Sequence, residues 1–176
     1  NFVPDVHAFE RLEDHRARGA GGTSVIFPMP DTSMWAHISE FPPGRYKKAH
    51  RHHPGANVGI LTGTGFSLLW EEGWDRKVRI DWDERSMFTP PARWYHQHFN
   101  VSERPDRYFA MHAPKLGTLE EASMFDYTDR RNQIEYTAED PTIREIYEAE
   151  LAERGLASDM PDGAYEDADY VFEPAD

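Results

Sequence analysis

Residues 44–63 read G-R-Y-K-K-A-H-R-H-H-P-G-A-N-V-G-I-L-T-G, and three histidines fall within four positions just before a run of strand-forming residues. The side chains of a β-strand alternate between its two faces, so His50 and His52 would share one face while Arg51 and His53 point the other way. Two imidazoles on one face of a strand are half of a metal site. The stretch therefore predicts a strand that presents two paired ligands.

A second pair of histidines lies in residues 91–100, P-A-R-W-Y-H-Q-H-F-N. By the same alternation Trp94, His96, His98 and Asn100 share one face of a later strand. If the sheet closes into a barrel, the imidazole of His96, and with it that of His98, can meet the first pair. Short strands separated by Gly and Pro turns favour such a barrel or a jelly roll.

The two stretches resemble the paired motifs of the cupins, G-x5-H-x-H-x3-E-x6-G and G-x5-P-x-G-x2-H-x3-N. The matching positions are Gly44, His50, His52 and Gly63 in the first motif, and Pro91, His96 and Asn100 in the second. The resemblance covers roughly residues 34–113 and implies an all-β fold, the cupin double-stranded β-helix or jelly-roll barrel. It also implies that His50, His52 and His96 bind a metal.

The chain departs from the cupin motifs in three places. Ala56 stands where the glutamate ligand is expected, and its neighbour Asn57 is a poor substitute because a neutral amide supplies no charge. Asp81 or Asp83 stands near the opening glycine of the second motif, and Arg93 replaces its inner glycine. Without the glutamate the metal keeps its full double charge, which favours an anionic, bidentate ligand at the open positions.

Similar three-histidine cupins include diketone, gentisate, salicylate and thiol dioxygenases. The resemblance therefore implies a non-haem Fe(II) dioxygenase that acts on a small anionic bidentate substrate, such as a hydroxy-aromatic acid or a diketone. Manganese, nickel, zinc and copper stay open as the metal, because three imidazoles do not choose among them. Two other functions stay open: a non-catalytic cupin that binds a ligand or activates an enzyme, and a metal-dependent lyase or isomerase.

Other polar residues near the motifs are candidates for roles around the metal. His98 is expected to be an orienting partner or a proton carrier rather than a ligand, although a packed core imidazole is the alternative. Arg93 is expected to hold a substrate carboxylate through its two-pronged guanidinium, and a solvated turn residue is the alternative. Tyr46 and Lys48 share the parity of His50 and could reach the cavity as donors.

Composition limits the classes of partner. The chain has 176 residues and 39% hydrophobic content, enough for one core. Its formal net charge of −13 argues against nucleic acid or an anionic membrane surface as a partner. Without cysteine, any metal must be held by nitrogen or oxygen, and a cytoplasmic location is expected. Neither a signal-like start nor a long apolar run is present.

The chain divides into four expected segments. They are an N-terminal helical arm (1–22), the barrel (23–116), a C-terminal extension with a helix that starts at Asp140-Pro141 (117–157), and an acidic tail (158–176). The tail composition is typical of a solvated or disordered segment, although its aromatic residues could pack on a partner surface. Because the sequence begins at Asn1 and not at a methionine, a preceding domain, as in a tandem bicupin, stays an open alternative. Sheet edges and the amphipathic helix favour a homodimer or such a tandem pair.

Overall fold

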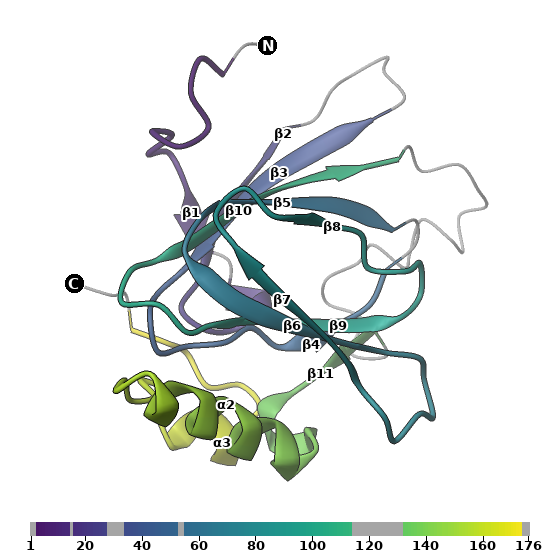
Figure 1. The fold of residues 1–176 in the computed structure, drawn as a ribbon, viewed down its shortest axis with the longest axis vertical. Coiled ribbons are helices and arrows are strands. Elements are labelled where there is room, and N and C mark those ends of the chain that lie inside the picture. Colours follow the sequence, from purple (N-terminus) through teal and green to yellow (C-terminus); the bar gives the residue numbers. More distant parts are fainter. Residues whose placement is uncertain (1–2, 15, 28–33, 53–54, 114–131, 174–176) are drawn as a thin grey trace.

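The computed structural model describes residues 3–14, 16–27, 34–52, 55–113 and 132–173. Two antiparallel β-sheets face each other, and the helices pack beside one of them (Figure 1). The predicted all-β jelly roll is confirmed.

The first sheet has six strands in the order β1-β2-β3-β10-β5-β8. These are β1 (Glu13–Asp14), β2 (Thr23–Phe27), β3 (Trp35–Phe41), β10 (Asp106–His112), β5 (Ala56–Thr62) and β8 (Met87–Phe88). The second sheet has five strands in the order β11-β4-β9-β6-β7. These are β11 (Gln133–Ile134), β4 (Ala49–His50), β9 (Tyr95–Asn100), β6 (Thr64–Trp70) and β7 (Val78–Asp83). Strands distant in sequence, such as β3 and β10, pair through the crossovers of a jelly roll.

Strand β9 lies in the middle of the second sheet, paired with β4 on one side and β6 on the other. All six of its residues are buried, because the barrel interior covers one face and the C-terminal segment covers the other. On the outer face, the ring of Phe99 stacks on Phe66 at 4.5 Å between centroids and contacts Tyr147. The strand that carries His96 and His98 is therefore fixed from both sides.

The C-terminal helix α2 (Pro141–Glu153) begins where the sequence predicts. The carboxylate of Asp140 accepts a hydrogen bond from the backbone N–H of Thr142 at 3.1 Å, which caps the helix. At the other end, Gly155 adopts a φ of 72°, a conformation that glycine tolerates best. The helix buries Ile143, Tyr147 and Leu151 against the outer face of the second sheet, whereas Ile146 stays 38% exposed.

The acidic tail is not a solvated segment over its described residues. After the helix α3 (Gly163–Glu166), the rings of Tyr165, Tyr170 and Phe172 pack against the same core cluster as helix α2. These aromatic residues supply apolar surface that a disordered segment lacks, which explains the difference from the composition-based expectation.

The helical arm expected over residues 1–22 is wrong for the described residues of that segment. The described residues there form only strand β1 and a 3-10 helix, η1 (Arg16–Arg18). The guanidinium of Arg107 donates hydrogen bonds to the carbonyls of Val6 (3.3 Å) and Phe9 (3.0 Å), so these carbonyls are occupied by tertiary contacts. The ring of Phe9 also packs edge-on against β2. Such contacts outweigh helix propensity in so short a segment.

Within the described part of the chain, no helix has both the length and the apolar character needed to cross a membrane.

Candidate metal centre

His50, His52 and His96 lie together at one end of the barrel. One potential ligand nitrogen from each lies within 4.8 Å of the others. The pairing of β4 with β9 places His50 directly opposite His96, with 4.3 Å between ring centroids, and His52 lies 4.9 Å from His96. Just past β4, the carbonyl of His52 accepts a hydrogen bond from the backbone N–H of Arg93 at 2.9 Å, which positions the third ring. The three residues predicted as ligands are thus brought together.

Backbone carbonyls select the tautomers of two of these rings. Nδ1 of His50 lies 3.1 Å from the carbonyl oxygen of Lys48, and Nδ1 of His96 lies 3.2 Å from that of Trp94. A carbonyl oxygen can only accept, so each Nδ1 carries the hydrogen and each Nε2 keeps a free lone pair. Burial, followed by the charge of Arg18, lowers the pKa of His50 well below its ordinary value, and burial does the same to the pKa of His96. Both rings are therefore neutral at pH 7, as metal binding requires.

No carboxylate belongs to this histidine group in the described part of the chain. Ala56 is 3% exposed on β5, at the position where the cupin motif has glutamate. Asn57 is exposed and accepts a hydrogen bond from the hydroxyl of Thr89 at 2.8 Å. Three imidazoles without an anionic ligand fit a divalent metal that keeps its full charge.

Arginines occupy the two backbone positions where the second cupin motif has glycines. Arg93 has a φ of 69° and Arg85, six residues before Pro91, has a φ of 75°. The opening glycine therefore corresponds to Arg85, and its expected location near Asp81 or Asp83 is wrong. The side chain of Arg93 is exposed. Its predicted contact with a substrate carboxylate stays a prediction.

His98 lies one layer deeper in the barrel than the three clustered rings. Its ring is 5.6 Å from that of His96, and its Nδ1 lies 2.7 Å from the hydroxyl of Ser67. The indole N–H of Trp82 donates to that hydroxyl at 2.9 Å, so the Ser67 O–H is available to donate to Nδ1. This arrangement leaves Nε2 of His98 as the protonated nitrogen. Burial, followed by the charge of Lys47, lowers the pKa of His98 to about 3, so the ring is a neutral donor.

The expectation that Tyr46 and Lys48 reach the cavity is wrong. Tyr46 pairs with Phe99 and His50 pairs with His96, so four residue steps on one strand oppose three on the other. This extra residue is a β-bulge, which reverses the alternation of side chains. Outside the barrel, the hydroxyl of Tyr46 donates to Glu139, and the ammonium of Lys48 pairs with Glu135.

Because of the bulge, Lys47 points into the barrel. Its backbone N–H donates to the carbonyl of His98 at 3.0 Å, so the two residues lie in register. The side chain is fully buried: the ammonium donates to the hydroxyl of Ser39 and lies 5.3 Å and 5.2 Å from the ring centroids of Phe41 and Tyr108. No ion pair to a carboxylate forms at Lys47 within the described residues. Burial lowers the pKa of Lys47 to about 7.

Strict alternation of side chains over residues 44–53 did not predict that Lys47 points into the barrel. The sequence analysis also missed two histidines on other strands. His112 on β10 and His37 on β3 add two further imidazoles beside the group, with the His112 ring 5.3 Å from that of His52. The alternation of β10, in which Asp106, Tyr108, Ala110 and His112 are buried, is the sequence signal that could have found His112. His53 lies outside the described residues.

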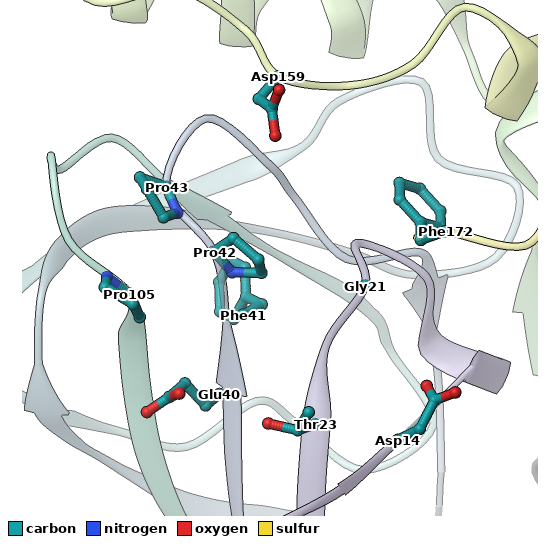
Figure 2. A pocket seen from close by; sticks show the side chains of 10 residues that line it. All are labelled: Asp14, Gly21, Thr23, Glu40, Phe41, Pro42, Pro43, Pro105, Asp159 and Phe172. Carbon is teal, nitrogen blue, oxygen red and sulfur yellow. The ribbon is translucent and has the colours of Figure 1, made fainter. Parts of the chain in front are cut away.

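A cavity of about 600 Å³ lies at the other end of the barrel (Figure 2). The strand register separates it from the histidines, because Phe41 at the cavity and Trp35 beside His112 are at opposite ends of β3. Figure 2 shows Asp159 and Phe172 of the C-terminal segment facing side chains from the barrel strands and loops. The cavity is lined by Asp14, Gly21, Thr23, Glu40, Phe41, Pro42, Pro43, Pro105, Asp159 and Phe172. None of the predicted site residues lines it.

No family model matches the chain, and no curated protein matches it either. Solved structures with a similar fold include oxalate decarboxylase from Lactobacillus farciminis in a formate complex, with 13% identity and a TM-score of 0.51, covering 61% of this chain and 32% of that one. CapF with the inhibitor 3-isopropenyl-tropolone has 11% identity and a TM-score of 0.52, covering 62% and 32%. The cupin domain of Schizosaccharomyces pombe Cnp3 has 18% identity and a TM-score of 0.50, covering 67% and 76%.

These similarities concern the fold. The chain spans about a third of the length of the oxalate decarboxylase and CapF chains that it matches. The predicted double-stranded β-helix is confirmed by this shared architecture, and the three-histidine group fits a metal site in it.

Replacing Lys47 by methionine should stabilise the protein, and more so at low pH. The ordinary pKa of lysine is 10.5 and the pKa of Lys47 in the folded state is about 7, so between these values the unfolded chain holds a proton that the folded chain has released. The contribution of Lys47 to stability therefore rises with pH from about 7 to 10.5, and its cost is complete below pH 7. Lys47→Met removes that cost, and we expect a gain in unfolding free energy larger by roughly 1–3 kcal/mol at pH 6 than at pH 9. Urea unfolding at both pH values measures this difference, and an equal effect at both would contradict it.

Proposed function

We propose that this chain, which has the cupin fold, binds one divalent metal through His50, His52 and His96 and uses it to bind a small anion with two adjacent oxygen donors. The observation that carries the proposal is the group of three close imidazoles, two of them held by backbone carbonyls in the neutral tautomer that leaves Nε2 free. A metal bound there would supply a Lewis acid and, if redox-active, a site for O2.

The charge of the barrel interior supports an anionic ligand. Three imidazoles leave the metal with its full double charge. Two cationic side chains, Lys47 and Arg18, are buried nearby, and their charges contribute to the lowered pKa of His98. The ammonium of Lys47 forms no ion pair with a carboxylate among the described residues, which is costly for a buried cation, and a bound anion would offset part of that cost. The interior thus favours an anion over a neutral ligand of the same shape.

The reaction we propose is that of a non-haem Fe(II) dioxygenase, in which both atoms of O2 enter a hydroxy-aromatic acid or diketone substrate. In this reaction His98 donates a hydrogen bond from its neutral Nε2–H to the bound substrate, and its low pKa keeps it from acting as a charged acid at pH 7. Arg93 would pair with a substrate carboxylate at the rim. The buried rings of the interior exclude bulk water from the bound anion.

A metal-dependent lyase is the second candidate, and one observation favours it. Lys47 is buried and has a pKa of about 7, so it can hold or release a proton near neutral pH. A decarboxylation or similar cleavage needs such a proton to replace the departing group. Unlike the dioxygenase, the lyase would consume no oxygen.

The first prediction of this proposal concerns metal content. Purified protein supplied with iron, cobalt or zinc should bind about one ion per chain, and alanine at His50, His52 or His96 should lower occupancy to a small fraction, because each removes one of only three ligands. Elemental analysis after gel filtration measures this. His7→Ala is the matched control, because His7 is exposed on the N-terminal arm. Full occupancy in the His96→Ala protein would refute the assignment.

The second prediction concerns oxygen. Anaerobic titration of the iron-loaded protein with salicylates, gentisate and diketones should produce charge-transfer bands with at least one of them, because a chelating anion replaces water on the metal. Admission of air should then consume one O2 for each product molecule. Turnover that proceeds equally without oxygen, or an iron spectrum unchanged by every compound, would reject the dioxygenase and leave a lyase or a binding role in its place.

We also propose that the chain forms a homodimer or pairs with a second barrel. Helix α2 no longer supports this, because its apolar residues are buried on the chain's own barrel. The support comes from the sheet edges, where Met87 on β8 is 72% exposed and Val78 on β7 is 39% exposed. Light scattering at micromolar concentration should give about twice the chain mass of 20.4 kDa, and a monomer mass would contradict the dimer.

A further inference from the structure

A fourth imidazole fills the barrel wall next to the position of the missing glutamate. His112, the last residue of β10, is 2% exposed and pairs directly with Ala56 of β5. Residues paired in this way project from the same face of the sheet, with Cβ atoms about 5 Å apart. Ala56 occupies the glutamate position of the first cupin motif, and His112 therefore borders the space that a glutamate side chain would take.

Two contacts hold the ring of His112 in place. It stacks on the indole of Trp35 with 3.8 Å between centroids and 6° between planes. Its Nε2 forms a hydrogen bond with Nδ1 of His37 at 3.1 Å. A ring fixed by stacking and by one hydrogen bond cannot turn freely, so the direction of its other nitrogen is set before any ligand binds.

That other nitrogen has no hydrogen-bond partner. Nδ1 of His112 is buried and unpaired within the described residues, while the ring lies 5.3 Å from that of His52. Leaving a buried polar atom unpaired costs roughly 1–3 kcal/mol, so such atoms usually meet a ligand, a water or a metal. The ring that carries this unpaired nitrogen lies beside the candidate metal centre.

The tautomer of His112 decides what this nitrogen can bind. If Nδ1–H of His37 donates to Nε2 of His112, then Nδ1 of His112 carries a hydrogen and can donate to an anion. In the other tautomer it has a lone pair and could bind the metal. Its position favours the donor, because among the described residues the group of nitrogens within 4.8 Å of one another consists of His50, His52 and His96 and does not include His112. Three ligands also leave room on a six-coordinate metal for a bidentate anion and one further molecule.

We propose that His112 is a substrate-binding residue, which donates a hydrogen bond from Nδ1 to an oxygen of the metal-bound anion on the side of the site where Ala56 replaces the motif's glutamate. His37 is a positioning residue, because it fixes the tautomer of His112. The proposal rests on the proposed function, since the anion is bound to the metal of the three-histidine group. In this proposal, the absence of the glutamate leaves the metal with its full charge, and His112 binds the anion that this charge attracts.

The experiment uses the cobalt-loaded protein under anaerobic conditions, with salicylate as the probe. The dissociation constant of cobalt is measured by competition with a chelator, and that of salicylate from the cobalt absorption bands. In His112→Ala we expect the cobalt affinity to stay within about threefold and salicylate to bind roughly 10- to 100-fold more weakly, as for the loss of a hydrogen bond to a charged group. His112→Gln retains a donor and should lose less, and His7→Ala should change neither constant.

Several results would overturn the proposal, and each has a distinct meaning. Unchanged salicylate affinity in His112→Ala rejects the contact, while cobalt affinity that falls together with salicylate affinity makes His112 a metal ligand instead. The melting temperature of His112→Ala without metal shows whether this variant folds. If it does not fold, the dissociation constants of cobalt and salicylate are measured for His112→Gln and His37→Ala instead. Wild-type values in both variants reject the contact. Wild-type protein that binds no cobalt refutes the proposed function itself, and cobalt protein that does not bind salicylate refutes the anion site.

Discussion

The pairing of β4 with β9 is the constraint on which the site depends. It sets His50 opposite His96. The bulge between Tyr46 and His50 reverses which of the preceding side chains point into the barrel. Without the bulge, the alternation would place Lys47 outside the barrel and Tyr46 inside it. With it, the barrel receives an imidazole pair and a buried amine from the same short segment, and Tyr46 is free to join the outer core.

The C-terminal segment stabilises that pairing from outside. The side-chain amide of Gln97, on the outer face of β9, donates to the carbonyl of Lys47 at 2.9 Å and to the carboxylate of Glu139 at 3.0 Å. The hydroxyl of Tyr136 donates to the carbonyl of Tyr46 at 2.6 Å, so the bulged strand is bound through its backbone. The described part of the extension beyond the barrel therefore contributes to the geometry around the three histidines, although it supplies none of them.

Charge is distributed unevenly between the outside and the inside of this acidic protein. The chain has a formal net charge of −13, yet the side chains around the histidine group include buried Lys47 and Arg18 and no carboxylate ligand among the described residues. Burial lowers the pKa values of His50, His96 and His98 and keeps these three rings neutral. The buried cations and neutral imidazoles are compatible with the proposed metal and anion, and the net negative charge of the chain disfavours polyanions as partners.

The sequence was sufficient for the barrel and for the three clustered histidines, because strand alternation and the motif spacing both depend on local geometry. It was insufficient where a contact between distant segments decides. The bulge needs the register of β4 against β9, the arm at residues 5–14 follows the guanidinium of Arg107, and the proximity of His112 to Ala56 depends on the pairing of β10 with β5. The two turn positions of the second motif could not be recognised from the sequence, because arginine stands at both, Arg85 and Arg93, and a positive φ is unusual for arginine.

X-ray absorption spectroscopy of the cobalt-loaded protein tests the central claim, that the barrel binds a metal through imidazoles without a protein carboxylate. The account predicts scattering from three imidazole rings, with nitrogens at about 2.1 Å and the remaining positions filled by exchangeable oxygen. A spectrum with one imidazole or none, or with a carboxylate in the ligand shell, would contradict it.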